Sequence, residues 1–134
     1  MDAKAIDQLL ESQRQYFLSG ATLPVEFRIA MLQRLRETVR RREPDISKAL
    51  TADLGKSGYE GYMCEIGLVL SELGYLIRHT RRFAKRRHVP TPLAQFAASS
   101  YLSPSPYGNV LIMSPWNYPL LLTLDPLADA IAAG

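Results

Sequence analysis

The feature that most constrains this chain is the stretch of residues 108–120, which reads Gly-Asn-Val-Leu-Ile-Met-Ser-Pro-Trp-Asn-Tyr-Pro-Leu. Residues 109–113 form an apolar run of the β type, and the Ser-Pro pair that follows ends it. Pro119 then suits the first turn of a helix, where its missing N–H costs no hydrogen bond. The stretch therefore predicts a strand, a turn and a helix, with the carboxamide of Asn117 at the carboxyl end of the strand. Open α/β folds bind their ligands at that position.

The composition limits the kind of protein that carries this stretch. Apolar residues fill 47% of the 134 positions and charged residues fill 22%, which is typical of one folded domain or the front piece of a larger one. The longest apolar region, residues 120–133, contains two aspartates and a proline and is too short to span a bilayer. We therefore expect no membrane contact. The single cysteine fits a reducing compartment, and we expect a cytoplasmic location.

The residues that most often bind metals are few and scattered. His79 and His88 have the wrong spacing for a shared helical face, and one cysteine cannot form a CxxC zinc site. We therefore expect no metal. Cys64 lies inside an apolar helical pattern, so we expect a small buried thiol rather than a nucleophile.

Two helices are predicted before Gly55. The first ends at Ser19-Gly20, and the second follows Pro24 and ends at Gly55, with Pro44 as a candidate interruption. The positions at helical spacing are Ile6, Leu9, Leu10, Gln13 and Phe17 in the first helix, and Phe27, Met31, Leu32, Leu35 and Val39 in the second.

A third helix and an extended region follow. Residues 57–60, Ser-Gly-Tyr-Glu, have the form of a capping box. The helix after it carries one apolar stripe that we expect to be core: Met63, Ile66, Leu70, Leu73 and Ile77. Prolines at positions 90, 92, 104 and 106 bracket the extended run 96–103. Together with residues 109–113, this run predicts a β-hairpin or two neighbouring strands.

Several segments together resemble the amino-terminal part of an aldehyde dehydrogenase. They are Phe17-Leu18-Ser19-Gly20, Pro24, Phe27-Arg28-Ile29, residues 49–54, residues 106–119 and Ala130-Ile131-Ala132-Ala133-Gly134. The resemblance covers nearly the whole chain without obvious gaps. The ungapped Phe-x-Ser-Gly and Pro-x-x-Phe-Arg spacing is most similar to the class 3 branch of the family.

The resemblance implies an α/β fold in which this chain holds only the front portion. Residues 1–90 form amino-terminal helices, and residues 91–113 form strands that include a bridging hairpin. Residues 114–134 form the oxyanion-site turn and the helix after it, at the start of a Rossmann-like sheet. In relatives the hairpin region helps to hold subunits together, so the resemblance implies a homo-oligomer such as a dimer.

The resemblance also implies the chemistry. A cysteine thiolate attacks an aldehyde, hydride passes from the thiohemiacetal to NAD or NADP, and water releases the carboxylic acid. Asn117 then corresponds to the carboxamide donor of the oxyanion hole, a group that stabilises charge developing in the transition state. The residues beside the cofactor are Met113, Ser114, Pro115 and Trp116, and the aldehyde tunnel corresponds to Leu68, Tyr118 and Leu122. The matching nucleophile, general base and nucleotide turn are not in this sequence, so we expect the chain alone to be inactive.

Three alternatives stay open at this point. Asn117 could be a turn or helix-capping residue, as asparagines before a helix often are. The whole chain could be a stand-alone helical protein-interaction module without activity. The basic run at residues 78–88 could mark a nucleic-acid-binding domain. Because that run has few apolar anchors and no interleaved aromatic residues, a solvated helix end is the favoured interpretation, and we expect no nucleic acid.

Overall fold

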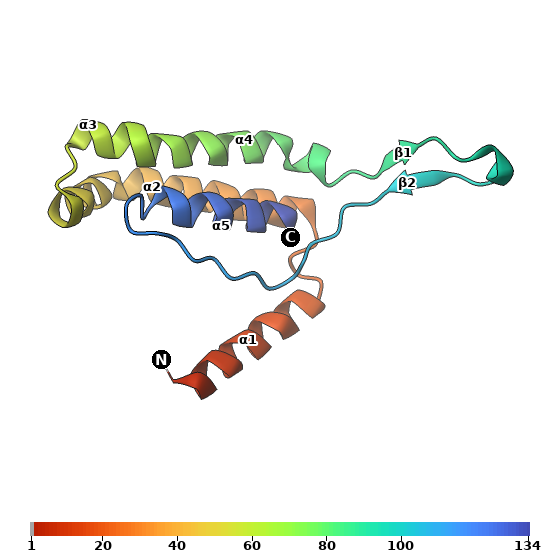
Figure 1. Cartoon of the computed structure of the whole chain (residues 1–134), viewed down its shortest axis with the longest axis horizontal. Helices are drawn as coiled ribbons and strands as arrows, with labels where there is room; N and C mark the ends of the chain where they lie inside the picture. The colour runs from red at the N-terminus through yellow and green to blue at the C-terminus, as the bar shows by residue number, and fades with distance from the viewer. Residues whose placement is uncertain (1) are drawn as a thin grey trace.

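The computed structural model describes residues 2–134. Three long helices lie side by side and enclose the core: α2 (Val25–Leu54), α4 (Gly67–Phe83) and α5 (Leu121–Ala133) (Figure 1). Helix α1 (Ala3–Leu18) lies apart from this bundle (Figure 1). The buried apolar side chains are Leu32, Val39, Leu50, Ile66, Val69, Leu73, Leu76 and Ala128. The chain places its carboxyl-terminal helix against two helices formed more than 35 positions earlier.

Helices α1 and α2 end where the sequence predicts, but the apolar positions at helical spacing in α1 are not buried. Helix α2 ends at Gly55, whose φ of 67° is a left-handed conformation that glycine adopts without strain. The candidate interruption at Pro44 is not observed, since α2 runs through it. Pro44 and Arg40 are both exposed, so water can bind the Arg40 carbonyl that has lost its helical partner.

The third helical segment is built from three pieces. The hydroxyl of Ser57 accepts a hydrogen bond from the amide of Glu60 at 3.1 Å, as the capping pattern predicts. A short helix α3 (Gly58–Gly61) leads into a π-helical turn, η1 (Tyr62–Ile66), and then into α4. A π turn holds more residues than an α turn, so it changes which side chains face the core.

This π turn explains an error in the predicted stripe. Met63 was expected in the core but is 50% exposed, while the neighbouring Glu65 is fully buried. Ile66 and Leu73 are buried as predicted. Four further positions outside the predicted stripe are buried on α4, namely Val69, Gly74, Leu76 and Thr80. An ideal helical period cannot anticipate this local change of register.

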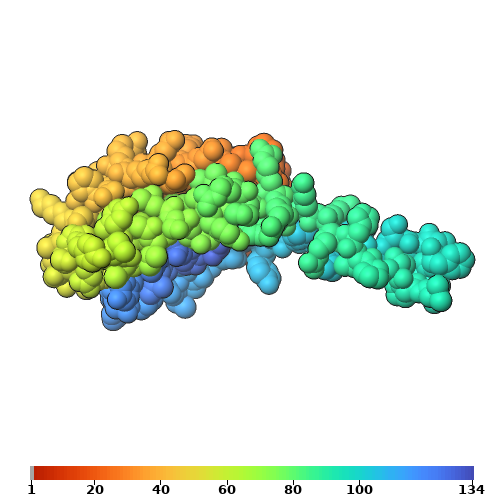
Figure 2. Space-filling model, turned by 90° about the horizontal axis from the view of Figure 1, so that it is seen from above, coloured from red at the N-terminus to blue at the C-terminus, as the bar shows by residue number. Residues whose placement is uncertain are grey.

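A two-stranded hairpin projects from the end of α4 (Figures 1 and 2). Strand β1 (Arg87–Val89) pairs antiparallel with β2 (Ser100–Leu102), and a single 3₁₀ turn, η2 (Leu93–Gln95), lies between them. A hairpin is therefore present, but the predicted pairing is wrong: the run 96–103 contributes β2, and its partner β1 lies within the region expected to be helical and not at residues 109–113. Residues 109–113 were predicted as a strand and form none. A strand needs a hydrogen-bonded neighbour, and no part of residues 2–134 pairs with them.

The loop after β2 returns along the bundle to α5 (Figure 1). Gly108 has a φ of 89°, and a Cβ atom there would lie 3.2 Å from the ring of Phe17. Next to it, the side-chain amide of Asn109 donates to the carbonyl of Leu10 at 3.1 Å. The lack of a side chain at Gly108 lets the loop approach Phe17, and the Asn109 hydrogen bond joins it to α1 before it enters the turn that precedes α5.

Candidate functional site

The turn before α5 carries most of the residues that the sequence singled out. Met113 is 84% exposed and Trp116 is 88% exposed. Pro115 and Asn117 are exposed as well, whereas Ser114 is half-buried. The turn is therefore an open surface of the described chain.

The amino terminus of α5 is capped by a residue that is distant in the sequence, Glu65 of η1. Oε2 of Glu65 accepts hydrogen bonds from the amides of Leu120 at 2.8 Å and Leu121 at 3.3 Å. A carboxylate at this point also complements the positive end of the helix dipole. The residue at the amino-terminal boundary of α5, Leu120, makes no side-chain capping bond. The alternative in which Asn117 caps this helix is therefore wrong, since Glu65 has that role.

The ammonium group of Lys56 holds the same turn by contacting Asn117 and Tyr118. Its Nζ donates to Oε1 of Glu65 at 2.5 Å and to the main-chain oxygen of Asn117 at 2.8 Å. The same Nζ lies 3.9 Å from the centre of the Tyr118 ring, a cation–π contact. The side chain of Lys56 is 8% exposed and that of Glu65 is 0% exposed. The ion pair is thus buried, and both charged groups have hydrogen-bond partners, as buried charges require.

Local structure explains how these two charges meet. Lys56 directly follows the left-handed Gly55, where the chain leaves α2, and its carbonyl accepts from the hydroxyl of Thr51 at 2.8 Å. Glu65 lies in the π turn η1. The pair therefore depends on two backbone features: the left-handed Gly55 that ends α2, and the π turn η1 that follows α3.

A second tie joins the start of the turn to α5. The hydroxyl oxygens of Ser114 and Thr123 lie 2.7 Å apart, within hydrogen-bond distance. The Thr123 hydroxyl also donates to the carbonyl of Pro119 at 2.6 Å. The segment that carries Asn117 is therefore held near both of its ends.

The three residues matched to the aldehyde tunnel lie on two structural elements. Leu68, in the first turn of α4, is 47% exposed, and Leu122, in the first turn of α5, is 37% exposed. Helices α4 and α5 pack against each other. Tyr118 is half-buried and its ring faces Lys56. The two leucines thus leave apolar surface uncovered near the turn-bearing end of the bundle.

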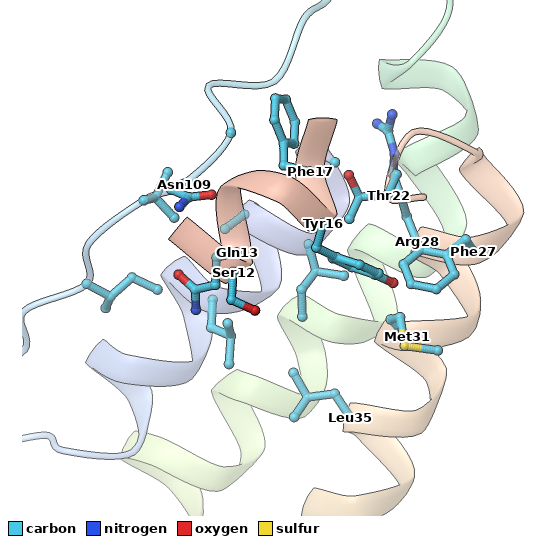
Figure 3. A pocket seen from close by; sticks show the side chains of 17 residues that line it. Ser12, Gln13, Tyr16, Phe17, Thr22, Phe27, Arg28, Met31, Leu35 and Asn109 are labelled. Atoms are coloured by element: carbon cyan, nitrogen blue, oxygen red, sulfur yellow. Dashed lines mark hydrogen bonds between the residues drawn. The ribbon is translucent and has the colours of Figure 1, made fainter. Parts of the chain in front are cut away.

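A separate cavity lies between α1, α2, α5 and residues 108–112 (Figure 3). Its volume is about 730 Å³, and Tyr16, Phe27 and Met31 are among its lining side chains. Arg28 borders it and donates to the carbonyls of Leu23 and Ala133, which closes the end of α5. None of the predicted site residues lines this cavity. The candidate site is therefore the turn and not this cavity.

The remaining candidate groups have structural partners. Nδ1 of His79 lies 2.7 Å from the Tyr75 carbonyl, and Arg81 pairs with Glu26 across α4 and α2. The hydrogen bond from Arg81 lowers the pKa of Glu26.

Cys64 is half-buried in η1, less buried than expected. Within residues 2–134 no three His, Cys, Asp or Glu side chains gather as a metal site would require. Over the same residues, no helix has the length and apolar character of a membrane span.

Sequence reasoning missed Lys56 and Glu65. The available signal was an acidic residue inside an apolar stripe, since a buried carboxylate needs a buried partner. The partner was not evident because Lys56 and Asn117 are 61 positions apart. Such a contact becomes visible only when the fold is known.

The described residues form a helical bundle with a projecting two-stranded hairpin and an exposed turn before α5. The chain superposes with a TM-score of 0.95 on a solved structure described as "Substrate bound state of Staphylococcus Aureus AldH". The two chains are 37% identical, and the match covers 100% of this chain and 29% of that one. The predicted fold class is thereby confirmed.

The profile of the Aldehyde dehydrogenase family matches residues 1–134, and the chain belongs to this family. It is 38% identical over 129 residues to the 4,4'-diaponeurosporen-aldehyde dehydrogenase of Staphylococcus aureus, covering 96% of this chain and 28% of that protein. It is 39% identical over 129 residues to aldehyde dehydrogenase family 3 member A2 of Rattus norvegicus, covering 96% of this chain and 27% of that protein. The resemblance to the class 3 branch is confirmed. The chain spans little more than a quarter of the length of these relatives.

Proposed function

We propose that this chain supplies the front part of an enzyme that oxidises an aldehyde to a carboxylic acid with NAD or NADP. The observation that carries the proposal is the turn at residues 113–120 in a chain of this family. Its main chain is tied to buried groups while Asn117 remains exposed. That combination suits a polar group that must be fixed in place and yet reach a ligand.

The proposed role of Asn117 is to donate an N–H to the oxygen of the reacting carbonyl. When a cysteine thiolate attacks the aldehyde carbon, the C=O π pair moves to oxygen and leaves a negative charge there. A neutral carboxamide donor held in position stabilises this charge more than it stabilises the uncharged aldehyde. The nucleophile is proposed to come from the rest of the enzyme, because Cys64 lies in η1 within the helical segment.

The proposed cofactor contacts are those of Met113, Ser114, Pro115 and Trp116. Met113 and Trp116 are 84% and 88% exposed, so a nicotinamide-ribose unit can reach this segment. When bound, NAD or NADP accepts the hydride of the oxidation. The exposed apolar surface of Leu68 and Leu122, with Tyr118, suits the hydrocarbon part of an aldehyde.

The proposed assembly is a homo-oligomer that uses the projecting hairpin. Leu93 is 88% exposed and Phe96 is 85% exposed at its tip region. Apolar side chains displayed on a protruding element are typical of a surface that a partner covers. The helical bundle of one subunit has no need to rearrange for this contact, because the hairpin lies away from it (Figure 2).

The test of the proposed function compares two proteins. One is this chain alone, and the other is this chain completed by the catalytic segments of its own enzyme. With hexanal or benzaldehyde, only the completed enzyme should reduce NAD or NADP, since the covalent step needs the nucleophile. A completed enzyme without turnover on any aldehyde, yet able to bind a protein partner, would favour the interaction-module alternative.

A further inference from the structure

We infer that Lys56 and Glu65 are positioning residues of the oxyanion site: together they hold the main chain of Asn117 so that its carboxamide meets the reacting oxygen. The inference rests on the proposed function. Neither side chain is accessible to a substrate, because they are 8% and 0% exposed. They therefore act through the turn and not on the aldehyde.

The geometry fixes the turn at two places that lie close together in the chain. Lys56 holds the carbonyl of Asn117 at 2.8 Å, and Glu65 holds the amides of Leu120 and Leu121 at 2.8 and 3.3 Å. The two anchoring groups are themselves joined at 2.5 Å. Between these anchors the chain has only Tyr118 and Pro119, and the proline ring restricts φ of the second. Little backbone freedom is left by which the carboxamide could change position.

The chemistry explains why a charged pair suits this task. One ammonium can bind the Glu65 carboxylate, the Asn117 carbonyl and the Tyr118 ring at the same time, which a neutral side chain of similar size cannot do. An oxyanion donor must be in place before charge develops, because its value depends on avoiding reorganisation during the reaction. A misplacement of about 1 Å in such a site can cost on the order of a hundredfold in rate.

The decisive variant is the double substitution Lys56→Met with Glu65→Gln in the completed enzyme. It removes both charges at once, so no uncompensated buried ion remains, and the glutamine oxygen can still cap α5. The tie to the Asn117 carbonyl is lost. The matched control is Glu26→Gln, which removes an exposed ion pair between α2 and α4, with exposures of 61% and 67%.

The measurement is the single-turnover rate of NADH or NADPH formation from hexanal, in the wild-type and Asn117→Ala backgrounds. We expect the double variant to slow this step at least about tenfold in the wild-type background. In the Asn117→Ala background it should slow the step no further, because the group it positions is gone. Dinucleotide affinity should match that of the control.

Each other outcome has a separate meaning. A wild-type rate, or the same loss in both backgrounds, overturns the positioning role and leaves the proposed function intact. An Asn117→Ala enzyme at full rate removes the oxyanion assignment and the positioning role with it. If the double variant does not fold, Lys56→Arg replaces it, since a planar guanidinium cannot keep all three contacts. A wild-type rate for that variant, or an equal loss in both backgrounds, also overturns the inference.

Discussion

The turn at residues 113–120 and the β1–β2 hairpin are both exposed, but they are held in different ways. The turn is tied to the buried Lys56–Glu65 pair and to Thr123. The hairpin strands pair with each other and with no other element of the described chain. At its base, Arg86 lies 4.9 Å from the ring of Tyr101. The turn is thus a surface of fixed geometry, whereas the hairpin is a projecting arm whose geometry the bundle does not set.

The largest expected effect is a loss of folding stability when the buried pair that holds the turn is disrupted. Glu65→Ala should lower the free energy of unfolding by about 3–5 kcal/mol, because it leaves the buried ammonium of Lys56 unpaired and two amides of α5 uncapped. Denaturant unfolding measures the loss. The control Arg42→Gln removes an exposed ion pair within α2 and should change stability little. Equal effects of the two substitutions would contradict the assigned importance of burial.

A smaller effect is expected at the hairpin. Replacing Leu93 and Phe96 by serine should weaken self-association of the completed enzyme at least about tenfold, since each exposed side chain would bury apolar surface against a partner. The melting temperature of the helical bundle should change little, because both side chains are largely exposed and η2, which carries Leu93, contacts none of its helices. Light scattering across a concentration series measures the association. An unchanged assembly would assign the contact to another surface.

The smallest expected effect is a pH-dependent change in stability at Asp125 in α5. Burial, with Glu72 and Asp129 nearby, raises the pKa of Asp125 above its ordinary value of 3.8. Its Oδ1 is buried and has no hydrogen-bond partner among residues 2–134. The folded state therefore binds the proton more tightly than the unfolded state, so this group favours folding below pH 3.8 and opposes it as pH rises through the raised pKa.

Asp125→Asn should accordingly raise the melting temperature at pH 7 by a small amount, since the group is partly solvated and screened. The gain should vanish at a pH below 3.8, where the aspartate is already neutral. Thermal unfolding at the two pH values measures the difference. A gain of the same size at both would mean that the charge is not its cause.

The sequence predicted the features that depend on neighbouring residues. The end of α2 at Gly55 and the cap at Ser57 follow from local backbone preferences. The errors come from contacts between distant segments. Residues 109–113 have the composition of a strand but no strand to pair with, and Met63 is exposed because η1 changes the helical register. The Lys56–Glu65 pair depends on that same register, so its link to Asn117 could not be read from a periodic pattern.

The central claim is that Asn117 is an oxyanion donor on a turn whose stability comes from other residues. The most direct test measures single-turnover rate and melting temperature for Asn117→Ala and Asn117→Asp in the completed enzyme. We expect Asn117→Ala to lose about a hundredfold in rate, on the order of 3 kcal/mol in the transition state, with little change in melting. Asn117→Asp should be slower still, because a carboxylate donates no hydrogen bond and repels the developing charge. Near-normal rates with lowered melting temperatures in both variants would contradict the account.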